Sequence, residues 1–142
     1  MYEKILLPVD LSAEQSWARA LPSALQLGGP NIVLHVMTVL PDFGMSMVGS
    51  YFDKGFEKKA LHDVGEALSD WVNKNVPDEV DVHPHVTHGR IYDQIIAAAD
   101  KLKVDAIVIG AHTPELADYL LGPNAARVVR HARQSVFVVR GE

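Results

Sequence analysis

The stretch Ala106-Ile107-Val108-Ile109-Gly110-Ala111-His112-Thr113, followed after six residues by Leu120-Leu121-Gly122-Pro123-Asn124-Ala125, decides the fold. Its first half is a short, uniformly apolar run, which is typical of a parallel strand buried on both faces. Gly110 after the strand and Gly122 before an amphipathic segment leave main-chain N–H groups free to bind phosphate. The stretch predicts a strand, a turn and a helix, with a nucleotide as the first ligand to test, although a tight turn would also explain Gly110.

Short apolar runs and longer amphipathic segments alternate along the rest of the chain. Strands are predicted at Ile5–Val9, Asn31–Met37, Val80–Val86, Ala106–Ile109 and Ser135–Val139. Helices are predicted after Ser12, over 61–71 before Pro77, over 91–102 and over 124–132.

The first predicted helix carries two signals that need interpretation. Ser12 occupies an N-cap position and Gln15 completes a capping box, which predicts that a helix begins directly after the first strand. Pro22 lies inside this segment, where a proline costs a helix about 3 kcal/mol. We therefore expect either a kink at Pro22 or a helix that restarts with Pro22 in its first turn.

Strands that alternate with helices of this length indicate βαβ units with right-handed crossovers. The sequence predicts an α/β fold, a doubly wound five-stranded parallel sheet of order 3-2-1-4-5 with helices on both faces. Pro84 lacks an N–H group, so its strand is expected at an edge. Ligands bind such sheets beyond the carboxyl ends of the strands. Here these ends carry Pro8-Val9-Asp10, His35-Val36 and Gly110-Ala111-His112.

Composition narrows the class of partner. The 142 residues, 48% hydrophobic and 22% charged, are typical of one globular domain. A net charge of −5 disfavours nucleic acids and anionic membranes, which bind clustered Lys and Arg. The absence of cysteine excludes a disulfide, a thiolate nucleophile and a cysteine zinc site. No apolar run approaches the roughly 20 residues of a membrane span or forms a signal segment, so we expect a cytoplasmic protein.

Several histidines invite a metal hypothesis. His83 and His85 share one face of a predicted strand, and His88 follows them. No carboxylate or cysteine pattern completes a site, so solvated histidines are favoured and no metal ligand is predicted. His35 and His112 are interpreted as satisfied buried or rim side chains.

Six segments in a fixed order carry a resemblance to a known family. They are ILLPVDLS (5–12), LHV (34–36), HGRIYDQI (88–95), IVIGAH (107–112), LLGPNAARVVRHA (120–132) and VFVVR (136–140). Together they resemble the universal stress protein family, in its small single-domain bacterial type. The resemblance implies one adenine nucleotide α-hydrolase-like domain over 1–142 that binds ATP, or ADP or AMP, with or without Mg²⁺.

The resemblance also implies a set of site residues. In ATP-binding members, adenine lies against the end of the second strand, here Val36, where the main chain contacts the base. Asp10 stands where the family has an aspartate beside the ribose and adenine, and Pro8 lines that pocket. From the residues alone, a turn or capping role for Asp10 is an equal alternative. The implied nucleotide-binding residues are Pro8, Val9, Asp10, Val36, Ile109, Gly110, His112, Thr113, Gly122, Pro123, Asn124 and Ala125.

The chain departs from the family's nucleotide motif, which is glycine, two residues, glycine, nine residues, then glycine followed by serine or threonine. Gly110 matches the first glycine, but Thr113 stands at the position of the second. Only eight residues, rather than nine, separate Thr113 from Gly122. Pro123 replaces the hydroxyl residue and has neither a hydroxyl nor an N–H group. The remaining donors are the amides of Gly122 and 124–126, so triphosphate affinity should suffer more than adenine and ribose affinity.

Three functions remain open. The first is an ATP-binding regulatory protein of the stress response, whose ligand state alters a surface that partners contact. The second is a nucleotide-free interaction protein of the same fold, suggested by Thr113 and Pro123. An enzyme stands third, because Walker A, G-x-G-x-x-G, G-x-S-x-G and SGG-x-DS motifs are absent and no catalytic residue is evident. At most, slow ATP hydrolysis would use Mg²⁺ held by the phosphates and Asp10. Arg127 or Arg130 would add positive charge if it faces the site.

Two segments are candidates for protein contacts. Residues 41–56 lack a clean periodicity and are expected to form a mobile loop that packs its own apolar residues, with a partner-binding lid as the alternative. Val136–Val139 is uniformly apolar and nearly terminal, and an exposed apolar edge favours pairing with another chain. We therefore expect a homodimer through this strand, as the family resemblance also implies.

Overall fold

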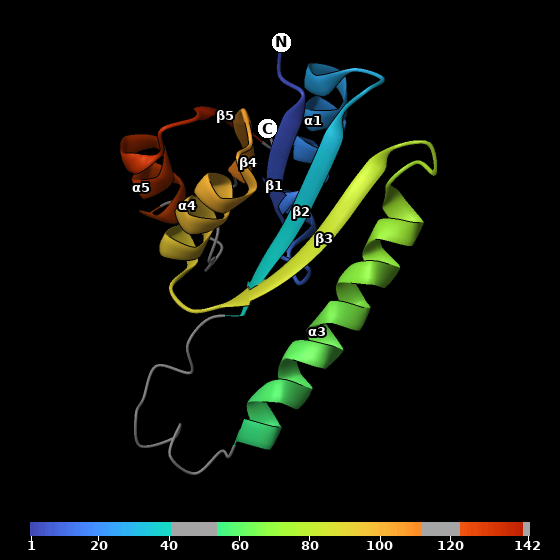
Figure 1. Ribbon diagram of the computed structural model, residues 1–142, viewed down its shortest axis with the longest axis vertical. Helices are drawn as coiled ribbons and strands as arrows, with labels where there is room; N and C mark the ends of the chain where they lie inside the picture. The colour runs from blue at the N-terminus through green and yellow to red at the C-terminus, as the bar shows by residue number, and fades with distance from the viewer. Residues whose placement is uncertain (41–53, 112–122, 141–142) are drawn as a thin grey trace.

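The computed structural model describes residues 1–40, 54–111 and 123–140. In these ranges the chain forms a five-stranded sheet in the order β3-β2-β1-β4-β5, with every neighbouring pair parallel (Figure 1). The strands are β1 (Lys4–Pro8), β2 (Val33–Leu40), β3 (Asp81–His88), β4 (Ala106–Ala111) and β5 (Ser135–Arg140). The helices are η1 (Glu14–Ser16, a 3₁₀ turn), α1 (Ala20–Gly28), α3 (Lys54–Asn75), α4 (Ile91–Leu102) and α5 (Pro123–His131). The predicted fold class and strand order are confirmed.

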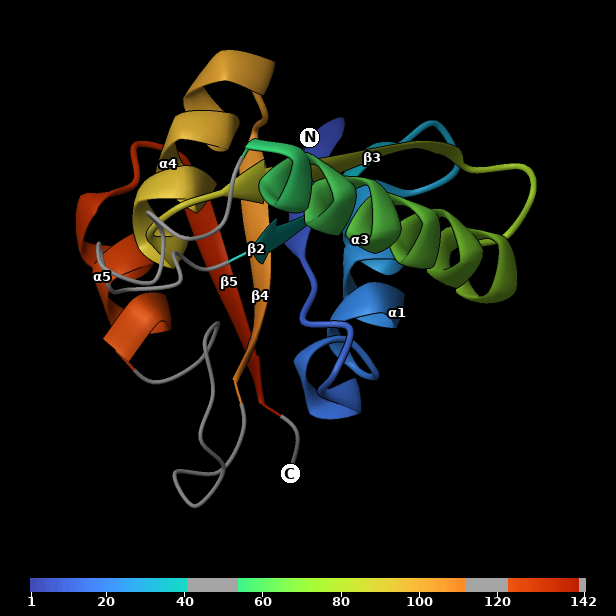
Figure 2. The ribbon, with the colours of Figure 1, turned by 90° about the horizontal axis from the view of Figure 1, so that it is seen from below.

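Helices cover both faces of the sheet (Figure 2). On one face α1 and α3 pack over Leu7, Val36 and Val108, with Trp17 and Trp71 in edge-to-face contact at 5.4 Å between ring centroids. On the other face α4 and α5 pack over Leu6, Met37 and Ile107. Alternate residues of each central strand therefore enter opposite cores, which explains why these strands read as continuous apolar runs.

The connection from β1 to α1 differs from the prediction. Ser12 does not cap a helix, because its N–H and Oγ–H both donate to Asp10 Oδ1, at 3.0 and 2.7 Å. A turn and the short η1 follow instead, with Ala13 at the N-cap position of η1. The helix proper begins at Ala20, so Pro22 lies in its first turn and the restart alternative is confirmed.

Several boundaries of strands and helices also differ from the prediction. The second strand runs to Leu40 rather than Met37, and α3 starts at Lys54, within the segment expected to be a loop. The rest of that loop, 41–53, lies outside the described residues. The strand holding Pro84 is at the sheet edge as predicted, and α3 runs beside it (Figure 1). Gly89, with a φ of 139°, turns the chain into α4, because only glycine adopts this conformation readily.

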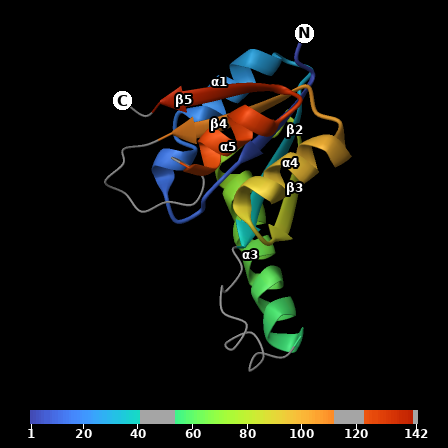
Figure 3. The same ribbon diagram turned by 90° about the vertical axis from the view of Figure 1, so that its left-hand side faces the viewer.

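The last strand forms the opposite edge of the sheet (Figure 3). Phe137 packs on one face, where its ring meets Tyr2 edge to face at 5.3 Å, and Val136 packs on the other. Val138 remains 39% exposed. Within the described ranges, no helix is both long and apolar enough to cross a membrane.

Candidate functional site

The centre of the sheet is the point where the strand order reverses. β1 lies between β2 and β4, with Leu6 opposite His35 on one side and opposite Ile107 on the other. The chain runs from β1 towards β3 in one direction, and β4 to β5 continue in the other. Doubly wound sheets bind ligands at this crevice, beyond the carboxyl ends of the strands. The candidate site therefore lies beyond β1 and β4.

Asp10 stands at this crevice in an organised turn. The buried Pro8 and Val9 precede it, and the Val9 N–H donates to Met37 O of β2 at 2.8 Å. The Asp10 N–H donates to Oγ of the fully buried Ser16 at 2.9 Å, which fixes its backbone. Its Oδ1 accepts both donors of Ser12, so the turn interpretation of Asp10 is correct. In the described part of the chain, Oδ2 has no hydrogen-bond partner, so a ligand role is compatible with the turn.

Close packing against η1 explains why residue 110 is a glycine. A Cβ on this residue would lie 2.3 Å from the main-chain oxygen of Ser16 and 3.3 Å from that of Gln15. The η1 turn thus lies directly against the end of β4 and closes part of the crevice. Ile109, just before it, is fully buried in the core under α4 and α5. Sequence reasoning did not foresee this contact, because it joins segments almost 100 residues apart.

Val36 is not at a strand end. Its side chain is fully buried, and it lies in register between Leu7 and Pro84, with four further residues of β2 after it. Met37 O accepts from β1, whereas Leu40 O accepts from Gly89 N–H beyond β3 at 3.0 Å. Because main-chain groups alternate in direction along a strand, those of Val39 point to the β1 side beyond Val9.

Val39 is therefore a candidate that sequence reasoning missed for main-chain contact with a ligand in the crevice. Its side chain is half-buried and packs against the core under α4. The available signal was the apolar, largely β-branched run that continues to Leu40, directly before Pro41.

The α5 end of the site is described only in part. Pro123 is the first residue of α5, a position that proline favours because its missing N–H has no helical partner there. Ala125 is buried against α4, and Asn124 is half-buried. His112, Thr113 and Gly122, three of the predicted site residues, lie outside the described residues.

Arg127 is exposed on α5 and contacts the first turn of α4. Its Cζ lies 4.8 Å from the centre of the Tyr92 ring, over α4, in a cation–π contact. The alternative in which Arg127 or Arg130 adds charge to the site stays a prediction. Arg130 is exposed in the last turn of α5, far along the helix from Pro123.

Of the histidines expected to be solvated, His83 is exposed, whereas His85 is half-buried; His35 is a satisfied, half-buried side chain, as expected. His35 and His85 are half-buried and hydrogen-bonded, Nδ1 to Nε2, at 2.9 Å. His83, whose side chain is 49% exposed, has its Nε2 2.8 Å from Asp81 Oδ1. Over the described ranges, no group of three or more His, Asp or Glu side chains is arranged to hold a metal ion.

Fold and crevice together define the class, a doubly wound α/β protein with a candidate ligand site at its β1–β4 switch point. The chain matches the universal stress protein family over residues 1–140, and it belongs to that family. It is 33% identical to universal stress protein G of Shigella flexneri over 142 residues, which cover 99% of this chain and 100% of that protein.

Solved structures agree with the fold. Universal stress protein UspA from Lactobacillus plantarum superposes with a TM-score of 0.72 at 21% identity, covering 98% of each chain. A universal stress protein in complex with cAMP gives 0.68 at 20% identity, covering 99% of this chain and 98% of that one. A family member from Arabidopsis thaliana with AMP bound gives 0.63 at 18% identity, covering 97% and 91%.

Proposed function

We propose that this chain is an adenine-nucleotide-binding regulatory protein of the stress response, acting in the cytoplasm as a homodimer. The ligand is ATP, ADP or AMP, with Mg²⁺ accompanying the longer phosphates. Family membership and the relatives that hold cAMP and AMP support the ligand class. Regulation follows from the ligand state altering the surface at the carboxyl edge of the sheet.

The observation that carries the proposal is the state of the Asp10 carboxylate. One oxygen is engaged by Ser12, and Oδ2 has no hydrogen-bond partner within the described ranges. A half-buried carboxylate oxygen at a switch-point crevice is suited to accept hydrogen bonds from ribose hydroxyls. Adenine would lie against the β2 main chain at Val39, whose backbone groups point to the β1 side beyond Val9.

The phosphate end is the weaker part of the proposed site. Because Pro123 begins α5, the first described main-chain donors of that helix are Asn124 and Ala125. We therefore expect AMP to bind nearly as well as ATP. The alternative, a nucleotide-free interaction protein, rests on this proline and on Thr113.

Calorimetric titration of the purified protein with ATP, ADP and AMP tests the proposal. Asp10→Asn retains an Oδ1 that Ser12 can donate to, but replaces Oδ2 with an NH₂ group that cannot accept. We expect AMP affinity to fall about 10- to 100-fold, since hydrogen bonds to charged groups contribute about 1.5–3 kcal/mol. The unfolding midpoint should stay close to wild type.

Two control variants separate the contributions. Ser12→Ala loosens the turn but retains the carboxylate, so AMP affinity should change little. Pro123→Ser restores a hydroxyl and an N–H group, so it should strengthen ATP binding more than AMP binding. Absence of heat for all three nucleotides up to millimolar concentration would contradict the proposal. Adenine absorbance released from the purified protein on denaturation would exclude the nucleotide-free alternative.

A further inference from the structure

Three imidazoles lie together on the α4 face of β2 and β3, outside the proposed nucleotide site. His35 is directly opposite His83 in the strand register, and His85 lies two residues further along β3. The His35 ring centroid is 5.2 Å from that of His83 and 5.1 Å from that of His85. We call His35, His83 and His85 the histidine cluster.

The one side-chain hydrogen bond within the cluster joins the two strands diagonally. His35 Nδ1 and His85 Nε2 are 2.9 Å apart, so one ring donates and the other must accept. An accepting nitrogen exists only on a neutral imidazole. The bond therefore requires that at least one of the two rings carries no charge.

We infer that the histidine cluster is a proton-sensitive contact that holds the edge strand β3 to the sheet at neutral pH and loosens it in mild acid. A first proton can be shared, since an imidazolium donates to a neutral imidazole. A second proton removes the acceptor and places two like charges in contact. β3 is the strand that responds, because β2 is its only neighbour among the described strands.

The charged groups around the cluster disfavour added protons. His85 faces Lys101 of α4, and His35 faces Lys4 of β1. Asp81, the described carboxylate that acts on His35, lies 2.8 Å from His83 and only partly offsets these charges. As pH falls, the face between β3 and α4 therefore accumulates positive charge.

The pKa values agree with this geometry. Burial, followed by His85 and His83, lowers the pKa of His35 from 6.5 to about 4. Burial, followed by His83 and Lys101, also lowers the pKa of His85. An opened strand regains the ordinary pKa, so it takes up protons between pH 6.5 and 4 while the closed sheet does not. Detachment of β3 from β2 is thus favoured as pH falls from 6.5 towards 4.

His85 also links the cluster to the surface. Together with Lys101 it borders a groove of about 540 Å³ between β3 and α4. Loosening of β3 would widen this groove and expose the edge of β2. The response to acid would thus be a change of shape at this edge of the sheet, away from the β1–β4 crevice.

Hydrogen exchange of the full chain, with rates corrected for intrinsic pH dependence, tests the inference. Protection of the β3 amides should fall by about tenfold or more between pH 7 and pH 5, relative to β4. His85→Gln retains hydrogen-bonding capacity but does not titrate, and it should remove most of this change. His62→Gln alters an exposed histidine of α3, paired with Glu66, and should leave the change intact.

A β3 protection that tracks β4 at every pH would overturn the inference, as would an unchanged pH response in His85→Gln. If that variant does not fold, the imidazole resonances of the wild-type protein decide. The pKa of His35 should lie far below the ordinary 6.5, and the β3 amide shifts should move with its titration. A His35 midpoint near 6.5 would refute the mechanism, whether or not the protein binds a nucleotide.

Discussion

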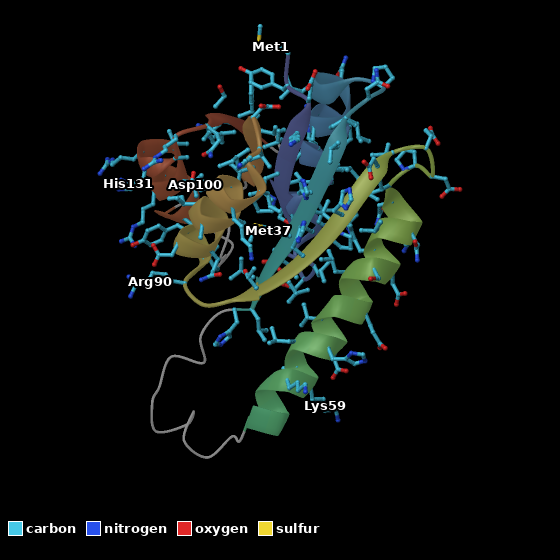
Figure 4. All side chains as sticks on the ribbon, in the orientation of Figure 1. Met1, Met37, Lys59, Arg90, Asp100 and His131 are labelled. Carbon is cyan, nitrogen blue, oxygen red and sulfur yellow. The ribbon has the colours of Figure 1, made fainter. Side chains whose placement is uncertain are left out.

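The centre of the sheet and its β3 edge are built from the same parallel pairing, but different forces hold them. At the centre, Leu6 and Ile107 are fully buried, and the main chain of η1 touches Gly110. At the edge, β2 and β3 pair over eight residues, and their side chains add the His35–His85 hydrogen bond beside Met37, which packs towards α4 (Figure 4). The centre is held by apolar packing and steric fit, whereas the edge carries in addition a contact that we infer to be sensitive to protonation.

The centre and the β3 edge therefore provide two different properties, a fixed geometry at the crevice and a response to acid at the edge. The switch-point crevice needs a fixed geometry, and apolar packing with close backbone contact provides it at any pH. An edge strand has only one neighbour, so loosening it leaves the remaining four strands paired. Sensitivity to acid is therefore placed where it disturbs the candidate site least.

The largest effect is expected at the centre, from Gly110→Ala. A Cβ there would lie 2.3 Å from Ser16 O, a backbone atom, so η1 must move. We expect a loss of about 1–3 kcal/mol in the free energy of unfolding, measured by urea denaturation.

Gly65→Ala in α3 is the matched control for that substitution. Its Cβ would meet only Val86 Cγ2, at 3.9 Å, and alanine favours helix, so stability should rise by up to about 1 kcal/mol. Equal stability of Gly110→Ala and wild type would mean that the η1 contact does not constrain the centre.

A smaller effect, dependent on pH, is expected at the β3 edge. The folded-state pKa of His35 is lowered, so its neutral form contributes stability that is present above 6.5 and lost as pH falls towards 4. Because the ring is only partly buried, we expect a loss of about 1 kcal/mol between pH 7 and pH 5. Urea midpoints at both values measure it, and His35→Asn should reduce the loss.

Asp105 provides a check on this pH window. Its carboxylate accepts the N–H groups of Glu3 and Lys4, both at 2.9 Å, and these bonds hold its pKa below 3.8. Its contribution is therefore lost only at lower pH. If His35→Asn and wild type lose stability in parallel above pH 4, His35 is not the source.

The smallest effect on stability is expected from a substitution at the β5 edge. The same substitution should nevertheless change the oligomeric state. Val138 is exposed on a strand with no neighbour on its outer side among the described residues, and no proline or histidine interrupts that edge as on β3. We expect Val138→Lys to convert a dimer into a monomer in light scattering, with stability changed by about 0.5 kcal/mol or less. Val129→Lys, at a more exposed valine of α5, should remain dimeric, and a monomeric wild type would refute this interface.

The local sequence pattern was sufficient to predict those elements whose position depends mainly on hydrophobic burial. Apolar runs identified four of the strands, because parallel strands buried on both faces leave few positions for polar residues. The half-exposed β3 was identified from its alternation of apolar and polar residues. The edge position of β3 followed from Pro84, whose missing N–H is a local property. The helix start at Ser12 was wrong, because the Asp10 carboxylate offered Ser12 a closer partner than a helix end.

The candidate site was predicted less completely than the fold. Asp10 and Gly110 were identified, and the structure brings both to the crevice. Their local roles, a turn for Asp10 and close packing against Ser16 for Gly110, depend on neighbours that sequence spacing does not show. Val39 was missed because the end of β2 was placed too early.

The sequence by itself determined the element order, the two-faced burial of the central strands and the family, since these rest on periodicity and residue order along the chain. Only the tertiary structure decided which distant residues meet: Gly110 with Ser16, and His35 with His85 across 50 residues. Contacts of that kind are fixed by strand register and packing, which arise only when the whole sheet has assembled.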